Sequence, residues 1–269
     1  LRNRVKIRAG SGADGTAVAI IDRSGTLGLI ENSGVISAAG ATAGSGRNVA
    51  IDLSANSAGA IVKQTVVAAN FAAPSIIGDV KFGTGSDTFD IADGSLTGNV
   101  SFGTGDNKFL LSGDARSTGN VSFGSGADTL STSGTTVFNG AVDFGGGADI
   151  LTIGGTSTFT GQLTNAAGLA VTVDKGTFGV VKAASIASLN VTNGGVLSVT
   201  LDQMAGASSQ LNVSGTASFG TGSTLQLNVA NVAQAEGHFV VINAGTLTGA
   251  SNLSTSTEFL PYLYKGALS

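Results

Sequence analysis

The segment Gly78-Asp79-Val80-Lys81-Phe82-Gly83-Thr84-Gly85-Ser86-Asp87-Thr88-Phe89 is followed by three further copies of its pattern. They occupy residues 98–109, 119–130 and 140–151. The copies therefore recur with a period of about 21 residues, which is typical of a repeat protein. Val and Phe stand two apart in each copy, which puts their side chains on one face of a strand. The Gly-x-Gly that follows supplies a turn, and the next Asp or Asn caps it.

One repeat of this length cannot bury an apolar face by itself, but repeats stacked about 4.8 Å apart can. Stacking would place the valines in one column and the phenylalanines in another. We therefore predict an all-β fold, a right-handed parallel β-helix (solenoid) with a C-terminal capping segment. The predicted structural core is Val80, Phe82, Val100, Phe102, Val121, Phe123, Val142 and Phe144.

Less regular strand-and-turn segments continue on both sides of the repeats. We predict β-helix coils over 1–235, with regular repeats of about 21 residues at 78–155. Gln64–Ala73 fits either a helical turn or a short irregular excursion. Residues 236–269 hold both tyrosines and a proline, which indicates a cap on the open end of the solenoid. The predicted cap residues are Phe239, Val241, Ile242, Leu260, Tyr262 and Leu263.

The composition narrows the function classes. The 269 residues include 42 glycines, no cysteine, one histidine and 11% charged residues. Thiol chemistry and cysteine-ligated metals are excluded, and one histidine leaves no multi-histidine centre. A formal net charge of −4 does not indicate a broad positively charged surface for nucleic acid, so we expect no nucleic acid as a partner. No apolar run reaches the length of a membrane-spanning helix.

Candidate catalytic groups are few. His238 would need a nucleophile and an orienting carboxylate, and no Gly-x-Ser-x-Gly motif occurs, so we expect an outward-facing strand residue. Paired carboxylates for sugar chemistry are the alternative, since Asp90, Asp93, Asp106 and Asp114 lie close in sequence. Their Gly and Ser neighbours indicate solvated turns, and basic residues are scarce there. We predict no catalytic residue, no cofactor and no enzyme activity.

The acidic turn position of the repeat has a second interpretation. Stacked turns would align Asp87, Asn107, Asp128 and Asp149 in one column. The element is similar to calcium-binding repeat-in-toxin sequences, which makes Asp87, Asp128 and Asp149 calcium candidates. However, the element recurs far less often than the nonapeptide of those proteins, and Asn107 interrupts the carboxylates. The sequence favours the alternative that each Asp bonds the amides of its own turn, so we predict no metal site.

Four of the 13 basic residues cluster at the start of the chain: Arg2, Arg4, Lys6 and Arg8. Their alternation with apolar residues predicts one strand with a charged, solvated face. A basic patch for lipopolysaccharide or DNA is the less favoured alternative. The opening residues also read like the middle of a domain, so we expect the chain to be part of a longer protein.

Several segments together resemble the passenger domains of bacterial autotransporters, which use type V secretion. They are the Asn-Ser-Gly-Val-Ile turn at 32–36, the phrase Ala-Ile-Asp-Leu-Ser-Ala-Asn at 50–56, the Phe-Gly-x-Gly-x-Asp repeats, and the segments 237–249 and 260–266. The last two segments look like the passenger's C-terminal autochaperone region. The resemblance covers nearly the whole chain and rests on the order of the motifs.

The resemblance implies an outer-membrane β-barrel downstream, barrel assembly machinery as a partner during export, and a location at the cell surface or outer membrane of a Gram-negative bacterium, or release from it. The expected function is a non-catalytic stalk that supports export and folding, with adhesion to an unnamed surface ligand as a second role. The alternative is a β-helix that binds or degrades polysaccharide. Fold alone does not separate these functions.

Overall fold

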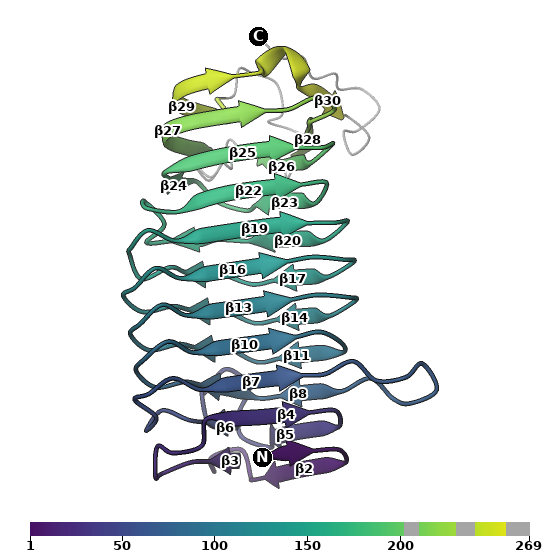
Figure 1. Cartoon of the computed structure of the whole chain (residues 1–269), viewed down its shortest axis with the longest axis vertical. Helices are drawn as coiled ribbons and strands as arrows, with labels where there is room; N and C mark the ends of the chain where they lie inside the picture. Colours follow the sequence, from purple (N-terminus) through teal and green to yellow (C-terminus); the bar gives the residue numbers. More distant parts are fainter. Residues whose placement is uncertain (202–209, 230–239, 257–269) are drawn as a thin grey trace.

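The computed structural model describes residues 1–201, 210–229 and 240–256, and this part of the chain is a parallel β-helix (Figure 1). Each coil up to residue 164 adds one strand to each of three parallel sheets, and the later coils add strands to two of them. In Figure 1 the strands of the longest sheet run from left to right on the near side. The chain returns behind them as it climbs from the N-terminal end, which makes the coil right-handed. The predicted fold class is confirmed.

The longest sheet has 12 strands and runs the length of the rod. Its strands, in stacking order, are β1 (Arg2–Asn3), β4 (Leu29–Asn32), β7 (Ile61–Gln64), β10 (Thr88–Ile91), β13 (Lys108–Leu111), β16 (Thr129–Thr132), β19 (Ile150–Gly154), β22 (Ala170–Asp174), β25 (Ser188–Thr192) and β27 (Leu211–Phe219). Two further strands, β24 (Ala184–Ile186) and β29 (Ile242–Thr248), also pair with β27. Buried and outward positions alternate along these strands, as the pleat requires.

The second sheet, of 11 strands, also runs the whole length. It comprises β2 (Lys6–Gly10), β5 (Val35–Ala39), β8 (Ser75–Ile77), β11 (Ser95–Thr97), β14 (Arg116–Thr118), β17 (Val137–Asn139), β20 (Thr158–Gly161), β23 (Thr177–Val180), β26 (Val196–Leu201), β28 (Thr224–Val229) and β30 (Ser254–Ser256). A short 3-10 helix, η2 (Ala250–Asn252), precedes β30.

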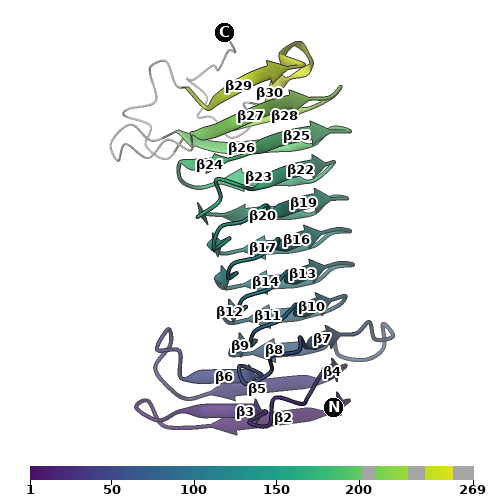
Figure 2. The same cartoon turned by 60° about the vertical axis from the view of Figure 1, so that its left-hand side comes forward.

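The third sheet has seven strands and ends before the other two. It comprises β3 (Ala17–Ile21), β6 (Asn48–Asp52), β9 (Asp79–Lys81), β12 (Val100–Ser101), β15 (Val121–Ser122), β18 (Val142–Asp143) and β21 (Leu163–Thr164). Figure 2 shows the short strands β9 and β12 beside β8 and β11 of the second sheet. The cross-section is therefore three-sided where the repeats are regular.

The core is a set of columns along the rod axis. The valines of the repeat align through the β9, β12, β15 and β18 ladder, and the phenylalanines that follow them stack ring on ring. Ring centroids lie 4.8 Å apart for Phe82 and Phe102, and 4.9 Å apart for Phe102 and Phe123. The eight predicted core residues are all at most 4% exposed: Val80, Phe82, Val100, Phe102, Val121, Phe123, Val142 and Phe144.

Another aromatic column, which the sequence pattern did not reveal, joins Phe138 and Phe159 at 4.8 Å, with Phe178 above them. These residues lie on the second sheet, one coil apart. The regular spacing of Phe82, Phe102, Phe123 and Phe144 concealed this column, because it begins only at Phe138. Leu96 and Ser117 occupy its place in the two preceding coils.

The irregular segments depart from the repeat at the loops and near the C-terminal end. Residues 65–74 form a loop that projects from the rod between β7 and β8, rather than a helical turn (Figure 1). Of the predicted cap residues, Val241 and Ile242 pack partly buried against the core, and β29 and β30 extend the two long sheets. The other four predicted cap residues lie outside the described residues: Phe239, Leu260, Tyr262 and Leu263. His238, which is not a predicted cap residue, also lies outside them.

Candidate functional sites: an aspartate column and a basic groove

The glycine-rich turns of the repeat stack on one another and align one polar side chain per coil. We call these side chains the aspartate column: Asp87, Asn107, Asp128 and Asp149. Each member directly precedes a strand of the longest sheet, from β10 to β19. A Cβ atom at Gly103 would collide with the carbonyl oxygen of Gly83 in the coil below, so the turns stack only without side chains there. The four column side chains are at most 1% exposed.

One oxygen of each column side chain accepts an amide from the preceding coil. Ala60 N–H donates to Asp87 Oδ1 at 2.7 Å, and Asp87 N–H donates to Asn107 Oδ1 at 3.0 Å. The same bond joins Asn107 to Asp128 at 2.8 Å and Asp128 to Asp149 at 2.9 Å. The expectation that each side chain bonds the amides of its own turn is therefore wrong. Amides at the start of these strands point along the stacking axis, toward the next coil.

The second atom of each side chain faces a different environment. The Oδ2 atoms of Asp87, Asp128 and Asp149 are buried and have no hydrogen-bond partner in the described part of the chain. The corresponding atom of Asn107 is Nδ2, which donates to the carbonyl oxygens of Gly105 at 2.8 Å and Gly103 at 3.3 Å. It also donates to Asp128 Oδ1 at 3.0 Å. The atoms around this position are thus hydrogen-bond acceptors.

Burial raises the pKa of all three carboxyl groups above the ordinary aspartate value, because the charged form loses its hydration. For Asp128 burial raises the pKa to about 6, against the bonds donated by Asn107, and the charges of Asp149 and Asp106 add to the rise. The single accepted amide bond at Asp87 and at Asp149 opposes the rise in pKa. The column therefore contains acids whose ionisation the fold disfavours.

The column presents one side chain per coil, and Asn107 separates Asp87 from the other two acids. Within residues 1–201, 210–229 and 240–256 there is no group of three or more His, Cys, Asp or Glu side chains placed to hold a metal ion. The calcium candidates Asp87, Asp128 and Asp149 thus lie in one column without forming such a group.

A second buried polar column, the amide ladder, consists of Asn3, Asn32 and Gln64 at the ends of β1, β4 and β7. Asn3 Nδ2 donates to Asn32 Oδ1 at 2.8 Å, and Asn32 Nδ2 donates to Gln64 Oε1 at 3.1 Å. Gln64 Nε2 ends the ladder on the carbonyl oxygen of Asp93 at 2.8 Å. Sequence reasoning missed the ladder because its members are unevenly spaced along the chain.

The predicted N-terminal basic strand is two strands, so that expectation is wrong. Because Asn3 turns inward to join the amide ladder, the chain bends at Arg4 and Val5 between β1 and β2. Arg2 therefore lies on the longest sheet, where it pairs with Glu31 at 2.6 Å, and Lys6 and Arg8 lie on the second sheet.

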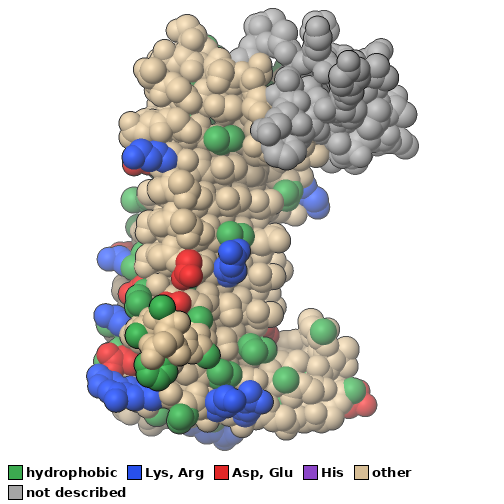
Figure 3. All heavy atoms as spheres, turned by 90° about the vertical axis from the view of Figure 1, so that its right-hand side faces the viewer, with side chains coloured by type: hydrophobic (Ala, Val, Ile, Leu, Met, Phe, Trp, Pro, Cys, Tyr) green, Lys and Arg blue, Asp and Glu red, His purple; other side chains and the backbone are tan. Residues whose placement is uncertain are grey.

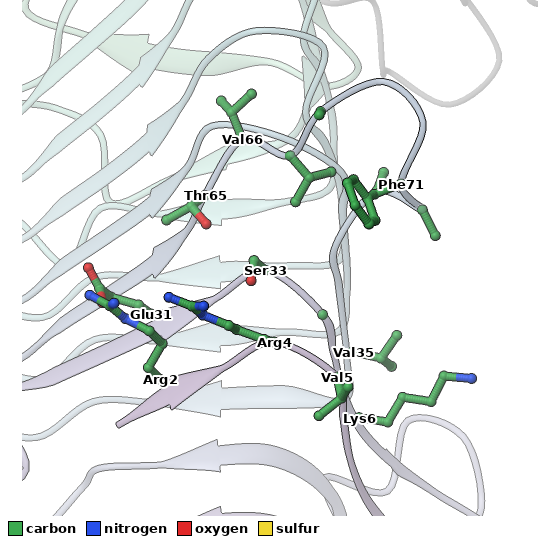
Figure 4. A pocket seen from close by; sticks show the side chains of 15 residues that line it. Arg2, Arg4, Val5, Lys6, Glu31, Ser33, Val35, Thr65, Val66 and Phe71 are labelled. Atoms are coloured by element: carbon green, nitrogen blue, oxygen red, sulfur yellow. The ribbon is translucent and has the colours of Figure 1, made fainter.

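A groove of about 970 Å³ lies between this bend and the projecting loop. Figure 4 shows Arg4 and Lys6 on one side of it and Phe71 of the loop on the other. Phe71 is 67% exposed and Val66 is 70% exposed. Figure 3 shows the hydrophobic side chains gathered near the N-terminal end of the rod, with Lys and Arg side chains around them. We call this feature the basic groove.

Two of the four acids considered for sugar chemistry, Asp93 and Asp106, accept hydrogen bonds from the backbone. Asp93 Oδ2 accepts the N–H of Val67 at 2.9 Å and so holds the projecting loop. Asp106 Oδ1 accepts the N–H of Ala127 in the next coil at 2.8 Å. Asp90 is half-buried on β10, beside Lys63 of β7, and Asp114 is exposed in a turn. These bonds give Asp93 and Asp106 a role in fixing the backbone.

No family model matches this chain, and neither a curated protein nor a solved structure matches it. The resemblance to autotransporter passengers therefore rests on the residues alone. None of the described residues belongs to a helix long and apolar enough to cross a membrane.

Proposed function

We propose that the chain is a non-catalytic stalk of an autotransporter passenger, displayed at the surface of a Gram-negative bacterium. The observation that carries the proposal is the unbroken stacking of coils through two sheets that run the length of the rod. Every coil in the described part of the chain pairs through backbone hydrogen bonds with its neighbours. Such a rod holds whatever is attached to its far end at a fixed distance from its base.

The architecture also suits export of an unfolded chain. Each coil contacts mainly its immediate neighbours, so coils can fold one after another as they emerge, each on the template of the last. Because the chain contains no cysteine, no disulfide can close a loop before the chain has passed through a narrow pore. In this proposal the partners are a downstream outer-membrane β-barrel and the barrel assembly machinery.

The test is to fuse the chain to an autotransporter barrel and to measure protease-resistant protein at the bacterial surface. The parent should be displayed and resistant. Phe123→Asp places a charge in the phenylalanine column and should destabilise the fold by about 4 kcal/mol, which abolishes resistance. Ser122→Asp is the matched control, because Ser122 is the exposed neighbour on β15. A parent chain that never becomes resistant at the surface would overturn the proposal, as would a resistant Phe123→Asp variant.

The basic groove supports a second candidate function, the binding of an acidic polysaccharide. Arg4 and Lys6 offer positive charge to carboxylate or sulfate groups, and the exposed ring of Phe71 offers a flat apolar face to a sugar ring. The volume matches that of ordinary ligand sites. Adhesion through this groove is compatible with the stalk, since it lies on the outside of the rod.

Titration calorimetry with oligogalacturonate, and with neutral dextran as the comparison, tests this function. The acidic glycan should bind, and the double variant Arg4→Ala/Lys6→Ala should weaken binding roughly tenfold. Arg116→Ala serves as the matched control, because Arg116 is an exposed arginine on β14, away from the groove. Equal losses from the groove and control variants would indicate non-specific attraction, and no heat with oligogalacturonate would refute the function.

A further inference from the structure

The aspartate column contains three carboxyl oxygens that conflict with their surroundings. Oδ2 of Asp87, Asp128 and Asp149 is buried and accepts no hydrogen bond from the described residues. An ionised carboxylate carries about half its charge on that oxygen. In a buried position this charge requires a donor or a cation, and without one it is strongly unfavourable.

Asn107 shows which kind of group fits this position. Its Oδ1 accepts the N–H of Asp87, which fixes the orientation of the amide and directs Nδ2 at the carbonyl oxygen of Gly105. A glycine with positive φ stands two residues before each column member: Gly85, Gly105, Gly126 and Gly147. The four turns therefore share this glycine conformation, and the turn before Asp149 adds positive φ at Gly145 and Gly146. At Asn107 the atom that corresponds to Oδ2 of the acids donates a hydrogen bond to the carbonyl oxygen of Gly105.

A protonated aspartic acid has the same shape and the same donor and acceptor positions as asparagine. We propose that Asp87, Asp128 and Asp149 each bind a proton on Oδ2 in the folded chain and donate it to the carbonyl oxygen of Gly85, Gly126 and Gly147. The central coils are thus a column of proton-binding sites that strengthen the rod in acidic medium. These sites exist whether or not the chain is exported.

The charges that face Asp128 act in the same direction as its burial. Asp149 and Asp106 both disfavour the charged form of Asp128, while Asn107 donates to its Oδ1 and opposes them. The pKa in the folded chain is raised to about 6 for Asp128, above its ordinary value of 3.8. The folded state therefore holds more protons than the unfolded state between these values, so stability falls as pH rises through this window.

A bound metal ion explains the column less well than protons do. The Oδ2 atoms have almost no accessible surface, and each coil contributes one side chain to the column, which at Asn107 is not an acid. A calcium ion takes six to eight oxygen ligands, whereas a proton needs one donor oxygen and one acceptor and no added volume.

The direct test is a titration of the aspartate side-chain carboxyl carbons in the whole chain by NMR, with Asp128→Asn to assign one signal. The Asp128 signal should have its midpoint near pH 6, and the signals of Asp87 and Asp149 should have midpoints above the ordinary aspartate value. Midpoints below about 4.5 for every aspartate would overturn the proposal.

A second measurement follows the unfolding equilibrium in urea at pH 5 and pH 7. The raised pKa of Asp128 by itself should make the equilibrium constant for unfolding about tenfold larger at pH 7 than at pH 5. The triple variant Asp87→Asn/Asp128→Asn/Asp149→Asn should lose most of this dependence and should be the more stable protein at pH 7. Asp79→Asn is the matched control, because Asp79 also accepts an amide from a neighbouring coil, at 2.8 Å, in a half-buried position.

Addition of calcium in the same experiment distinguishes protons from metal cations as the occupants of the column. Addition of calcium chloride to about 5 mM at pH 7 should leave the unfolding midpoints of the parent and the triple variant equally unchanged. A rise confined to the parent would show that cations, rather than protons, occupy the column, and would overturn the proposal.

Discussion

The amide ladder and the aspartate column are two buried polar columns of the same β-helix. They differ in the hydrogen-bond donors and acceptors that their side chains offer. In the ladder, Asn3, Asn32 and Gln64 each offer a donor and an acceptor, so each side chain satisfies the next. In the column, each Oδ1 accepts a backbone amide, and only Asn107 has a donor for the neighbouring carbonyl groups. The ladder is thus complete at any pH, whereas the column is complete only when its acids are protonated.

The difference shows that stacking selects for side chains that can repeat along the axis. A carboxamide repeats without limit because its two ends are complementary. A carboxylate above a carboxylate brings acceptor to acceptor, and charge to charge, so the repeat requires protons or interruptions. Asn107, between Asp87 and Asp128, is such an interruption. Substitutions that exchange the two chemistries should therefore affect the two columns differently.

The largest effect is expected from Asn32→Asp, which puts a carboxylate into the amide ladder. Asn32 Nδ2 donates to Gln64 Oε1 and to the carbonyl oxygen of Gly34, both at 3.1 Å, and the substitution replaces this donor with a charged acceptor. The free energy of unfolding should fall by about 3 kcal/mol at pH 7. Urea unfolding measures it, with Asn190→Asp on the exposed side of β25 as the control. Equal effects of the two substitutions would contradict the role of the ladder.

A smaller loss is expected from Asn107→Asp, which makes the column entirely acidic. The variant loses the bonds from Nδ2 to Gly105 and to Asp128 and adds a buried charge beside Asp128. Stability should fall by about 2 kcal/mol at pH 7, and by less at about pH 4.5, where the new acid is protonated. The control is Asn99→Asp, because Asn99 Oδ1 accepts the N–H of Asn120 at an exposed position. A loss that is the same at both pH values would count against protonation of the column.

The smallest effect concerns Asp22, an aspartate with the opposite surroundings. Ser24 Oγ donates to Asp22 Oδ1 at 2.6 Å and Leu27 N–H donates to Oδ2 at 2.8 Å, and these bonds hold the pKa of Asp22 below its ordinary value. The stabilisation by Asp22 is present at pH values above its pKa in the unfolded chain. It is lost as the pH falls through the lower pKa of Asp22 in the folded chain. In an NMR titration Ser24→Ala should move the midpoint of Asp22 upward. Ser54→Ala, in the equivalent bond to Asp52, should leave it unchanged.

Much of the fold follows from the repeat, because the period is a local property. Val80 and Phe82 lie two apart, and their copies recur with a period of about 21 residues, which predicts both the strand face and the stacking column. The irregular coils were harder to predict. The loop at 65–74 lengthens one coil, and the bend at Arg4 and Val5 divides a basic segment that reads as one strand. The basic groove arises between these two irregularities.

That the chain winds into coils follows from its amino-acid pattern, since glycine at the turns and apolar pairs in the strands specify short-range geometry that every copy shares. Which polar atoms meet is settled only in the folded chain. The donor for Asp87 comes from Ala60, in the preceding coil, and the partner of Asn32 is Gln64. These contacts depend on the exact length of each coil, summed over turns and loops. The ionisation of the column depends in turn on those contacts, because Oδ2 of each acid is buried without a donor, which favours the protonated form.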